Sequence, residues 1–191
     1  MQNEKWRQSV ILTDAEFLDR VAFDLIVNFE RMLGRRIPQG DLCKWLDCVA
    51  LDGGLRPGDN EVQALFIHGR ADSALRNFAP SSFSAELDGK AFRDKLGEFT
   101  LQSFPVEEVV AKDEFFLQCL ETLADAKEVE RLMVVGDLDA YGQRVKSVCA
   151  AAKGKDITLF SMQPLSGRGF SQEILGYSLM AALGISGDEL R

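Results

Sequence analysis

The sequence predicts a three-layer α/β/α fold built around a mainly parallel, five-stranded sheet. Short apolar runs typical of buried strands alternate along the chain with longer segments whose apolar residues recur at helical spacing. The clearest junction is the run Leu132–Val135, which stops at Gly136 and is followed at once by a helical pattern. Such alternation indicates βαβ units, whose right-handed crossovers bring the carboxyl ends of parallel strands to one edge of the sheet.

The individual elements follow from local patterns. A short apolar or alternating run indicates a strand, and apolar residues three or four positions apart indicate a helix. In chain order the expected elements are strand 9–13, helix 15–33, helix 39–51, strand 62–68, a short helix near 84–96, strand 98–104, a helix that follows Lys112-Asp113, strand 131–135, a helix through Val145–Ala152, strand 156–160 and helix 172–183.

Glycines and prolines mark the ends of these elements. Gly34 is placed to end the first helix, and Pro38 precedes the second. Gly53-Gly54 breaks the chain before the second strand. The segment 69–96 is less regular, and we expect it to form an insertion or a lid. The glycine-rich loop 166–169 leads to the last helix.

Length and composition favour one globular domain covering residues 1–191, because the chain is long enough for one sizeable core and shows no linker or internal repeat. Hydrophobic residues make up 46% and charged residues 27%, which is ordinary for a soluble globular protein. The formal net charge of −8 argues against a high-affinity, nonspecific nucleic-acid binder, which normally has a basic face. It leaves open a nuclease whose carboxylates hold a metal.

The sequence also gives an expectation for where in the cell the protein is found. The first residues are polar, and no apolar run approaches the roughly 20 residues that span a bilayer. We therefore expect no signal peptide, no membrane partner and a cytoplasmic location. The four cysteines form no CxxC pair and fall in apolar helical patterns, as buried reduced thiols do, and a chain with one histidine is a poor candidate for structural zinc.

Carboxylates stand at three of the strand-to-helix junctions. Asp14 follows the first strand, Asp113 precedes the helix after the third strand, and Asp137 and Asp139 follow the fourth strand. Residues at the ends of adjacent parallel strands, about 4.8 Å apart, can share one site. Several neighbouring carboxylates repel one another unless a cation offsets their charge, and oxygen ligands suit Mg²⁺ or Mn²⁺. The sequence thus predicts a metal site formed by these four acids. For any one acid, however, capping the following helix is a sufficient explanation.

The residues around Asp137 resemble the NYN group of PIN-like nucleases. In that family an apolar strand ends in a Ser-Gly-Asp-x-Asp-Phe type motif, and a helix and a Gly-Lys pair follow. Here the chain has Gly136-Asp137-Leu138-Asp139, a helix of matching length and Gly154-Lys155. Asp113 lies 137 − 113 = 24 residues upstream, at a spacing similar to that of the family aspartate, and Asp14 takes the aspartate position of the first strand. The resemblance spans about residues 8 to 161.

This resemblance implies a PIN-like, Rossmann-like fold and metal-dependent cleavage of RNA, with Asp14, Asp113, Asp137 and Asp139 as metal ligands. Departures from the pattern give an alternative. Val135 and Ala140 replace the family serine and phenylalanine, Phe17 replaces an asparagine, and Cys119 lies where a further acid is common. The alternative is a catalytically inactive PIN-like module that binds a protein partner or forms a homo-oligomer.

A third hypothesis is a small-molecule or nucleotide-binding domain that uses the loop Ser166–Gly169, whose backbone N–H groups could hold a phosphate. The GxG pattern of this loop is a weak signal. No GxGxxG motif follows the first strand, which argues against a dinucleotide site. His68 ends the second strand and could contact a phosphate, although an ordinary polar residue at a strand end is the simpler interpretation.

Overall fold

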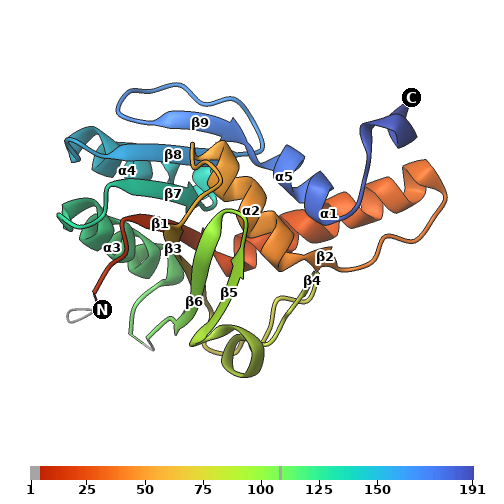
Figure 1. The fold of residues 1–191 in the computed structure, drawn as a ribbon, viewed down its shortest axis with the longest axis horizontal. Coiled ribbons are helices and arrows are strands. Elements are labelled where there is room, and N and C mark those ends of the chain that lie inside the picture. The colour runs from red at the N-terminus through yellow and green to blue at the C-terminus, as the bar shows by residue number, and fades with distance from the viewer. Residues whose placement is uncertain (1–4, 108) are drawn as a thin grey trace.

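The structure is a computed structural model, and it describes residues 5–107 and 109–191. A twisted sheet runs through the molecule with helices on both of its faces (Figure 1). In chain order the elements are β1 (Ser9–Asp14), α1 (Ala15–Leu33), β2 (Gly40–Asp41), α2 (Leu42–Asp52), β3 (Asn60–His68), β4 (Phe78–Ala79), the π-helix η1 (Phe83–Leu87), β5 (Lys90–Asp94), β6 (Gly97–Pro105), α3 (Lys112–Asp125), β7 (Arg131–Val135), α4 (Leu138–Ala151), β8 (Asp156–Ser161), β9 (Ser171–Ile174), α5 (Leu175–Ala182) and the 3-10 helix η2 (Gly187–Leu190).

The main sheet has seven strands in the order β5-β6-β3-β1-β7-β8-β9. The five strands expected from the sequence lie next to one another at its centre and are all parallel. Two further strands extend it: β5 pairs antiparallel with β6, and β9 pairs parallel with β8. A separate two-stranded sheet joins β2 to β4. The mainly parallel α/β architecture predicted from the sequence is therefore confirmed.

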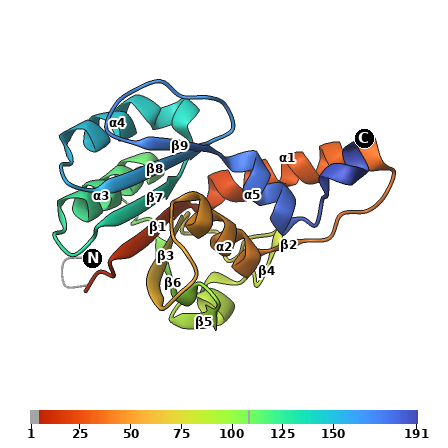
Figure 2. The ribbon, with the colours of Figure 1, turned by 45° about the horizontal axis from the view of Figure 1, so that its top comes forward.

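The central strand β1 shows how the three layers form. All six of its residues are buried, as expected of a parallel strand covered on both faces. Ile11 belongs to the core shared with α1, α2 and α5, whereas Val10 and Leu12 belong to the core shared with α3 and α4. This alternation follows the two-residue period of a strand. Figures 1 and 2 show the two groups of helices on opposite sides of the sheet.

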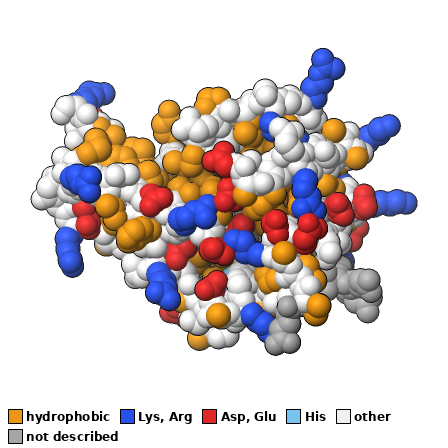
Figure 3. Space-filling model, turned by 180° about the vertical axis from the view of Figure 1, so that it is seen from behind, with side chains coloured by type: hydrophobic (Ala, Val, Ile, Leu, Met, Phe, Trp, Pro, Cys, Tyr) orange, Lys and Arg blue, Asp and Glu red, His pale blue; other side chains and the backbone are white. Residues whose placement is uncertain are grey.

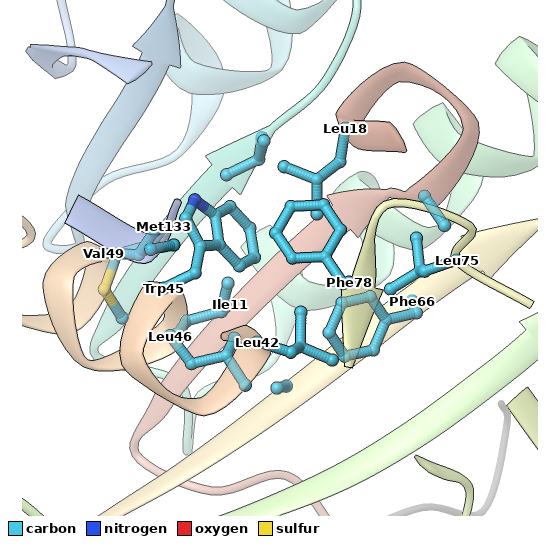
Figure 4. Packing of buried hydrophobic residues seen from close by; sticks show 14 of the residues in the cluster. Ile11, Leu18, Leu42, Trp45, Leu46, Val49, Phe66, Leu75, Phe78 and Met133 are labelled. Carbon is cyan, nitrogen blue, oxygen red and sulfur yellow. The ribbon is translucent and has the colours of Figure 1, made fainter. Parts of the chain in front are cut away.

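The larger core is centred on Trp45 of α2, which is fully buried. Figure 4 shows its indole ring between Met133 of β7 and the ring of Phe78, with Ile11 close by. The ring of Phe78 lies 6.2 Å away, measured between centroids. Truncating such a side chain to alanine costs about 3–5 kcal/mol, so this contact fixes α2 on the sheet.

Helix α1 is confirmed over the expected residues 15–33. The Asp14 side chain accepts the N–H of Phe17 at its first turn, and Gly34 ends it in the left-handed conformation at φ 64°. That conformation strains residues with a Cβ, which explains the glycine. Among the described residues, none of the helices combines the length and apolar character that crossing a bilayer requires.

Three expected elements differ from the structure. The helix expected at 39–51 begins at Leu42, because Asp41 caps it and residues 40–41 pair with β4. The helix expected at 172–183 begins at Leu175, because Ser171–Ile174 pairs with β8. In the segment 69–96, the short helix expected near 84–96 is a π-helix over Phe83–Leu87, and strand β5 follows it.

Candidate carboxylate site

Two of the carboxylates expected at the sheet edge, Asp14 and Asp137, lie where the strand order reverses. The chain adds β3 and β6 on one side of β1, and β7 and β8 on the other. The carboxyl ends of β1 and β7 therefore form the switch point at which open α/β sheets usually bind ligands. Asp14 is the last residue of β1, and Asp137 lies two residues after β7.

Asp14 is fully buried, and both of its oxygens have partners. Its Oδ1 accepts the backbone N–H of Phe17 at 3.2 Å, and its Oδ2 accepts the hydroxyl of Tyr141 at 2.8 Å. The ammonium of Lys112 lies 3.4 Å from Oδ1. A buried carboxylate needs hydrogen bonds and an opposite charge, and Asp14 has both from within the chain.

Tyr141 connects the two strand ends. Its hydroxyl donates to Asp14 and accepts the backbone N–H of Asp137 at 2.9 Å. Burial, together with the nearby charge of Asp14, raises the pKa of Tyr141 far above its ordinary value, so the phenol keeps its proton and remains a donor. The backbone of α4 is non-helical at Tyr141. Gly136 makes room for the ring, because a Cβ there would lie 2.7 Å from the hydroxyl oxygen.

Lys112 pairs with two acids. Its Nζ lies 2.6 Å from Oε2 of Glu16, in addition to the contact with Asp14. Burial lowers the pKa of Lys112, but the hydrogen bond to Glu16 and the charges of both acids outweigh burial and raise the pKa above its ordinary value. Lys112 is therefore a permanent cation at the carboxyl end of β1.

Asp137 has the same double role as cap and ion-pair partner. Its Oδ1 accepts the N–H of Ala140 at 3.2 Å, which caps α4. Its Oδ2 accepts from Nη2 of Arg20 at 2.7 Å. That hydrogen bond raises the pKa of Arg20, and its guanidinium also lies over the ring of Phe17, 5.6 Å from the centroid. Asp14 and Asp137 thus each have a cation of their own, Lys112 and Arg20 respectively.

The other two expected ligands lie in the first turns of helices. Asp113 is half-buried in the first turn of α3, where its Oδ1 accepts the N–H of Glu114; the N-cap position belongs to Ala111, which makes no side-chain cap. Asp139 is exposed in the first turn of α4. No hydrogen bond or ion pair within residues 5–107 and 109–191 joins Asp113 or Asp139 to Asp14 or Asp137.

The four acids therefore do not fit a metal as they are arranged. In the described part of the chain, no three or more His, Cys, Asp or Glu side chains are grouped so that they could hold a metal ion. The site is instead a set of alternating charges, in which Lys112 lies between Glu16 and Asp14, and Arg20 lies against Asp137. Figure 3 shows acidic and basic side chains side by side across the middle of the face seen from behind.

Sequence reasoning missed the partners of these acids. Tyr141 had a usable signal, because it lies only four residues after Asp137 in the sequence. Lys112 and Arg20 had none, because they come from other elements. Arg144 was also missed: it makes a two-bond ion pair with Glu114 at 2.6 and 2.7 Å, which joins α4 to α3.

The loop Ser166–Gly169 packs against α4. A Cβ at Gly169, where φ is 87°, would lie 3.0 Å from the carbonyl oxygen of Cys149, so this glycine permits the close approach.

His68 ends β3, as expected, and its ring stacks on Phe83 with 4.0 Å between centroids.

Comparison with known proteins assigns the chain to a family. Residues 3–190 match the family described as "Family of unknown function (DUF6621)", and because the match covers nearly the whole chain, the protein belongs to this family. No curated protein and no solved structure matches the chain.

Proposed function

We propose that this protein is a catalytically inactive PIN-like module that binds a second copy of itself or a protein partner. The observation that carries the proposal is the state of Asp14. Its charge is balanced by Lys112 and its second oxygen is bonded to Tyr141, so groups of the chain itself occupy the positions around it. A divalent cation would have to displace an ammonium that is also paired with Glu16.

The outer surface of α1 supports the interaction part of the proposal. Phe23 and Val27 are four residues apart, on one face of the helix, with side chains 54% and 37% exposed. Adjacent exposed apolar side chains of this size are a common feature of protein interfaces. A second copy that covered this face would remove both from water.

A metal-dependent ribonuclease that acts on RNA phosphodiesters is the second candidate. It is favoured by the position of Asp14 and Asp137 at the switch point, where one hydroxyl joins them. In this case Lys112 and Arg20 would leave the carboxylates, and Mg²⁺ or Mn²⁺ would take their place. Asp113 and Asp139 would have to turn toward the same point.

One experiment separates the two candidates. Thermal unfolding is followed with and without Mg²⁺ or Mn²⁺, and labelled single-stranded RNA is incubated with the wild type, with Asp137→Asn and with the exposed control Asp188→Asn. An inactive module shows no metal-dependent rise in melting temperature and no cleavage, since only a ligand that binds the folded state stabilises it. Cleavage that Asp137→Asn abolishes and Asp188→Asn retains would establish the nuclease.

A further inference from the structure

A cavity of about 440 Å³ opens beside the carboxylate site, at the carboxyl ends of β1 and β3. Its size is within the range of small-molecule sites, and this edge of the sheet is where such sites usually lie. One wall is α1 and the other is the loop that follows β3. Its lining includes Phe23, His68, Asp72, Arg76 and Phe83.

The walls of the cavity are held together by Asp19 of α1. Its carboxylate accepts the backbone N–H of Arg76 at 3.0 Å and that of Asn77 at 2.9 Å. The side-chain amide of Asn77 donates to the same carboxylate at 3.0 Å. Three hydrogen bonds therefore fix the loop against the helix, and a preformed cavity loses little conformational entropy when a ligand binds.

Aromatic rings supply the apolar part of the cavity. His68 is only 7% exposed, and its ring stacks on the buried ring of Phe83 with an angle of 4° between the planes. The Nδ1 atom of His68 lies 2.9 Å from the carbonyl oxygen of Gly69. A carbonyl only accepts hydrogen bonds, so Nδ1 is the donor in this contact, and in the uncharged form of the ring Nε2 is then an acceptor. Phe23 stands half-exposed at the same cavity.

Most of the charges that line the cavity already have partners within the chain. Glu16 pairs with Lys112, Arg20 pairs with Asp137, and Asp19 holds the loop. The side chains of Asp72 and Arg76 are exceptions to this pairing. Within the described residues, neither makes a hydrogen bond or an ion pair through its charged group, although both line the cavity. The cavity thus offers one carboxylate and one guanidinium to a ligand.

We propose that this cavity binds a free α-amino acid with a large apolar side chain. The guanidinium of Arg76 would bind the carboxylate of the ligand, a pairing that forms two parallel hydrogen bonds. The ligand's ammonium has three donors and no acceptor, and it would bind the carboxylate of Asp72 with Nε2 of His68 as a further acceptor. Its apolar side chain would cover Phe23. The proposal goes beyond the interaction function, because it needs neither a protein partner nor a metal.

Binding is measured by titration calorimetry on the full chain, with L-phenylalanine, L-leucine and L-tryptophan as probes. L-Phenylalaninamide lacks the carboxylate, and N-acetyl-L-phenylalanine lacks the ammonium. At least one free amino acid should bind, and both modified forms should bind at least tenfold more weakly, a loss of about 1.4 kcal/mol for each missing charge. Adenosine monophosphate is included as a competing ligand class.

Variants of the two unpaired charges complete the test. Arg76→Gln should weaken amino-acid binding at least tenfold without weakening the amide further, because the amide has no carboxylate to lose. Asp72→Asn should likewise weaken binding of the free amino acid at least tenfold. It should not weaken binding of the N-acetyl form further, because that form has no ammonium to lose. Arg168→Gln and Asp188→Asn, at exposed positions away from the cavity, should bind as the wild type does.

The proposal is overturned if none of the three amino acids binds at millimolar concentration, if binding is equal in Arg76→Gln and Arg168→Gln, or if only the nucleotide binds. Circular dichroism shows whether each variant is folded. Because none of these measurements contains metal or RNA, failure here leaves the proposed function untouched, and failure of that function leaves the cavity proposal untouched.

Discussion

The hydroxyl of Tyr141 donates to Oδ2 of Asp14 at 2.8 Å, across 127 residues of sequence. The same oxygen accepts the backbone N–H of Asp137. One side chain on α4 therefore joins the ends of two parallel strands, and the buried carboxylate depends on it for a hydrogen bond.

Replacing Tyr141 with phenylalanine removes both hydrogen bonds and keeps the ring. We expect Tyr141→Phe to lower the free energy of unfolding by about 1–3 kcal/mol, because an oxygen of Asp14 is left buried without a partner. Urea denaturation at constant m-value measures the loss. The exposed Tyr177 is the matched control, and Tyr177→Phe should change stability by less than about 0.5 kcal/mol. Equal effects at the two positions would contradict the role of Tyr141.

Replacing Lys112 with methionine leaves the buried Asp14 without its cation. We expect Lys112→Met to cost about 2 kcal/mol, since an unpaired buried charge is strongly unfavourable and this lysine is partly exposed. In the double variant with Asp14→Asn, the two losses should not add, and the coupling energy should be about 1 kcal/mol or more. Lys153→Met, at an exposed position, is the control. Strictly additive losses would show that the two groups do not interact.

Asp47 of α2 makes stability depend on pH. Burial, and then the neighbouring carboxylate of Asp94, raise the pKa of Asp47 to about 7, and its Oδ1 is buried without a hydrogen-bond partner. Because the folded-state pKa is raised, the folded protein binds a proton that the unfolded chain releases. The stability that this bound proton contributes is fully present below about pH 4, and it is lost as the pH rises through about 7.

The variant Asp47→Asn tests this dependence. Above pH 7 it should be more stable than the wild type by about 1–2 kcal/mol, a value reduced for solvent screening of a half-exposed group, and near pH 4 the two should be alike. Thermal unfolding between pH 4 and 8 measures the difference. Asp59→Asn, at a fully exposed position, should follow the wild-type curve at every pH. A constant offset between the Asp47→Asn and wild-type curves would be inconsistent with a titrating carboxylate.

Self-association through α1 is open to a direct test. We expect the average mass in sedimentation equilibrium to rise with concentration toward twice that of the chain. Val27→Asp should abolish this rise, because it places a charge in the middle of the covered face. Met32 is also exposed but lies on the other side of the helix, so Met32→Ser should self-associate like the wild type. A wild-type mass that stays at that of one chain at every concentration would contradict self-association and leave only a different protein as the partner.

The sequence was sufficient to place Asp14 and Asp137 at one edge of the sheet. Buried parallel strands have continuous apolar runs, and right-handed crossovers put the residues that follow them on the same side. What neutralises those acids could not be predicted, because Lys112 and Arg20 lie on α3 and α1, and their distance from the acids depends on how both helices pack. Strand spacing alone does not distinguish a metal from an ammonium group.

The two edge strands were missed for a related reason. Lys90–Asp94 and Ser171–Ile174 are polar and only partly buried, so neither has the apolar run that identifies a central strand. Their extended conformation is supported by hydrogen bonds to β6 and β8, which are partners that a local pattern does not reveal. Tertiary pairing overrides local propensity at both edges.

The central position of β1 affects how the chain folds as it is synthesised. Ser9 pairs with Val62 on one side and with Arg131 on the other, 131 − 9 = 122 residues later. The first strand made must therefore wait for two-thirds of the chain to leave the ribosome before both of its edges are covered. During that interval pairing with β3 can cover one edge of this apolar strand, whereas the edge that later pairs with β7 stays open to other chains.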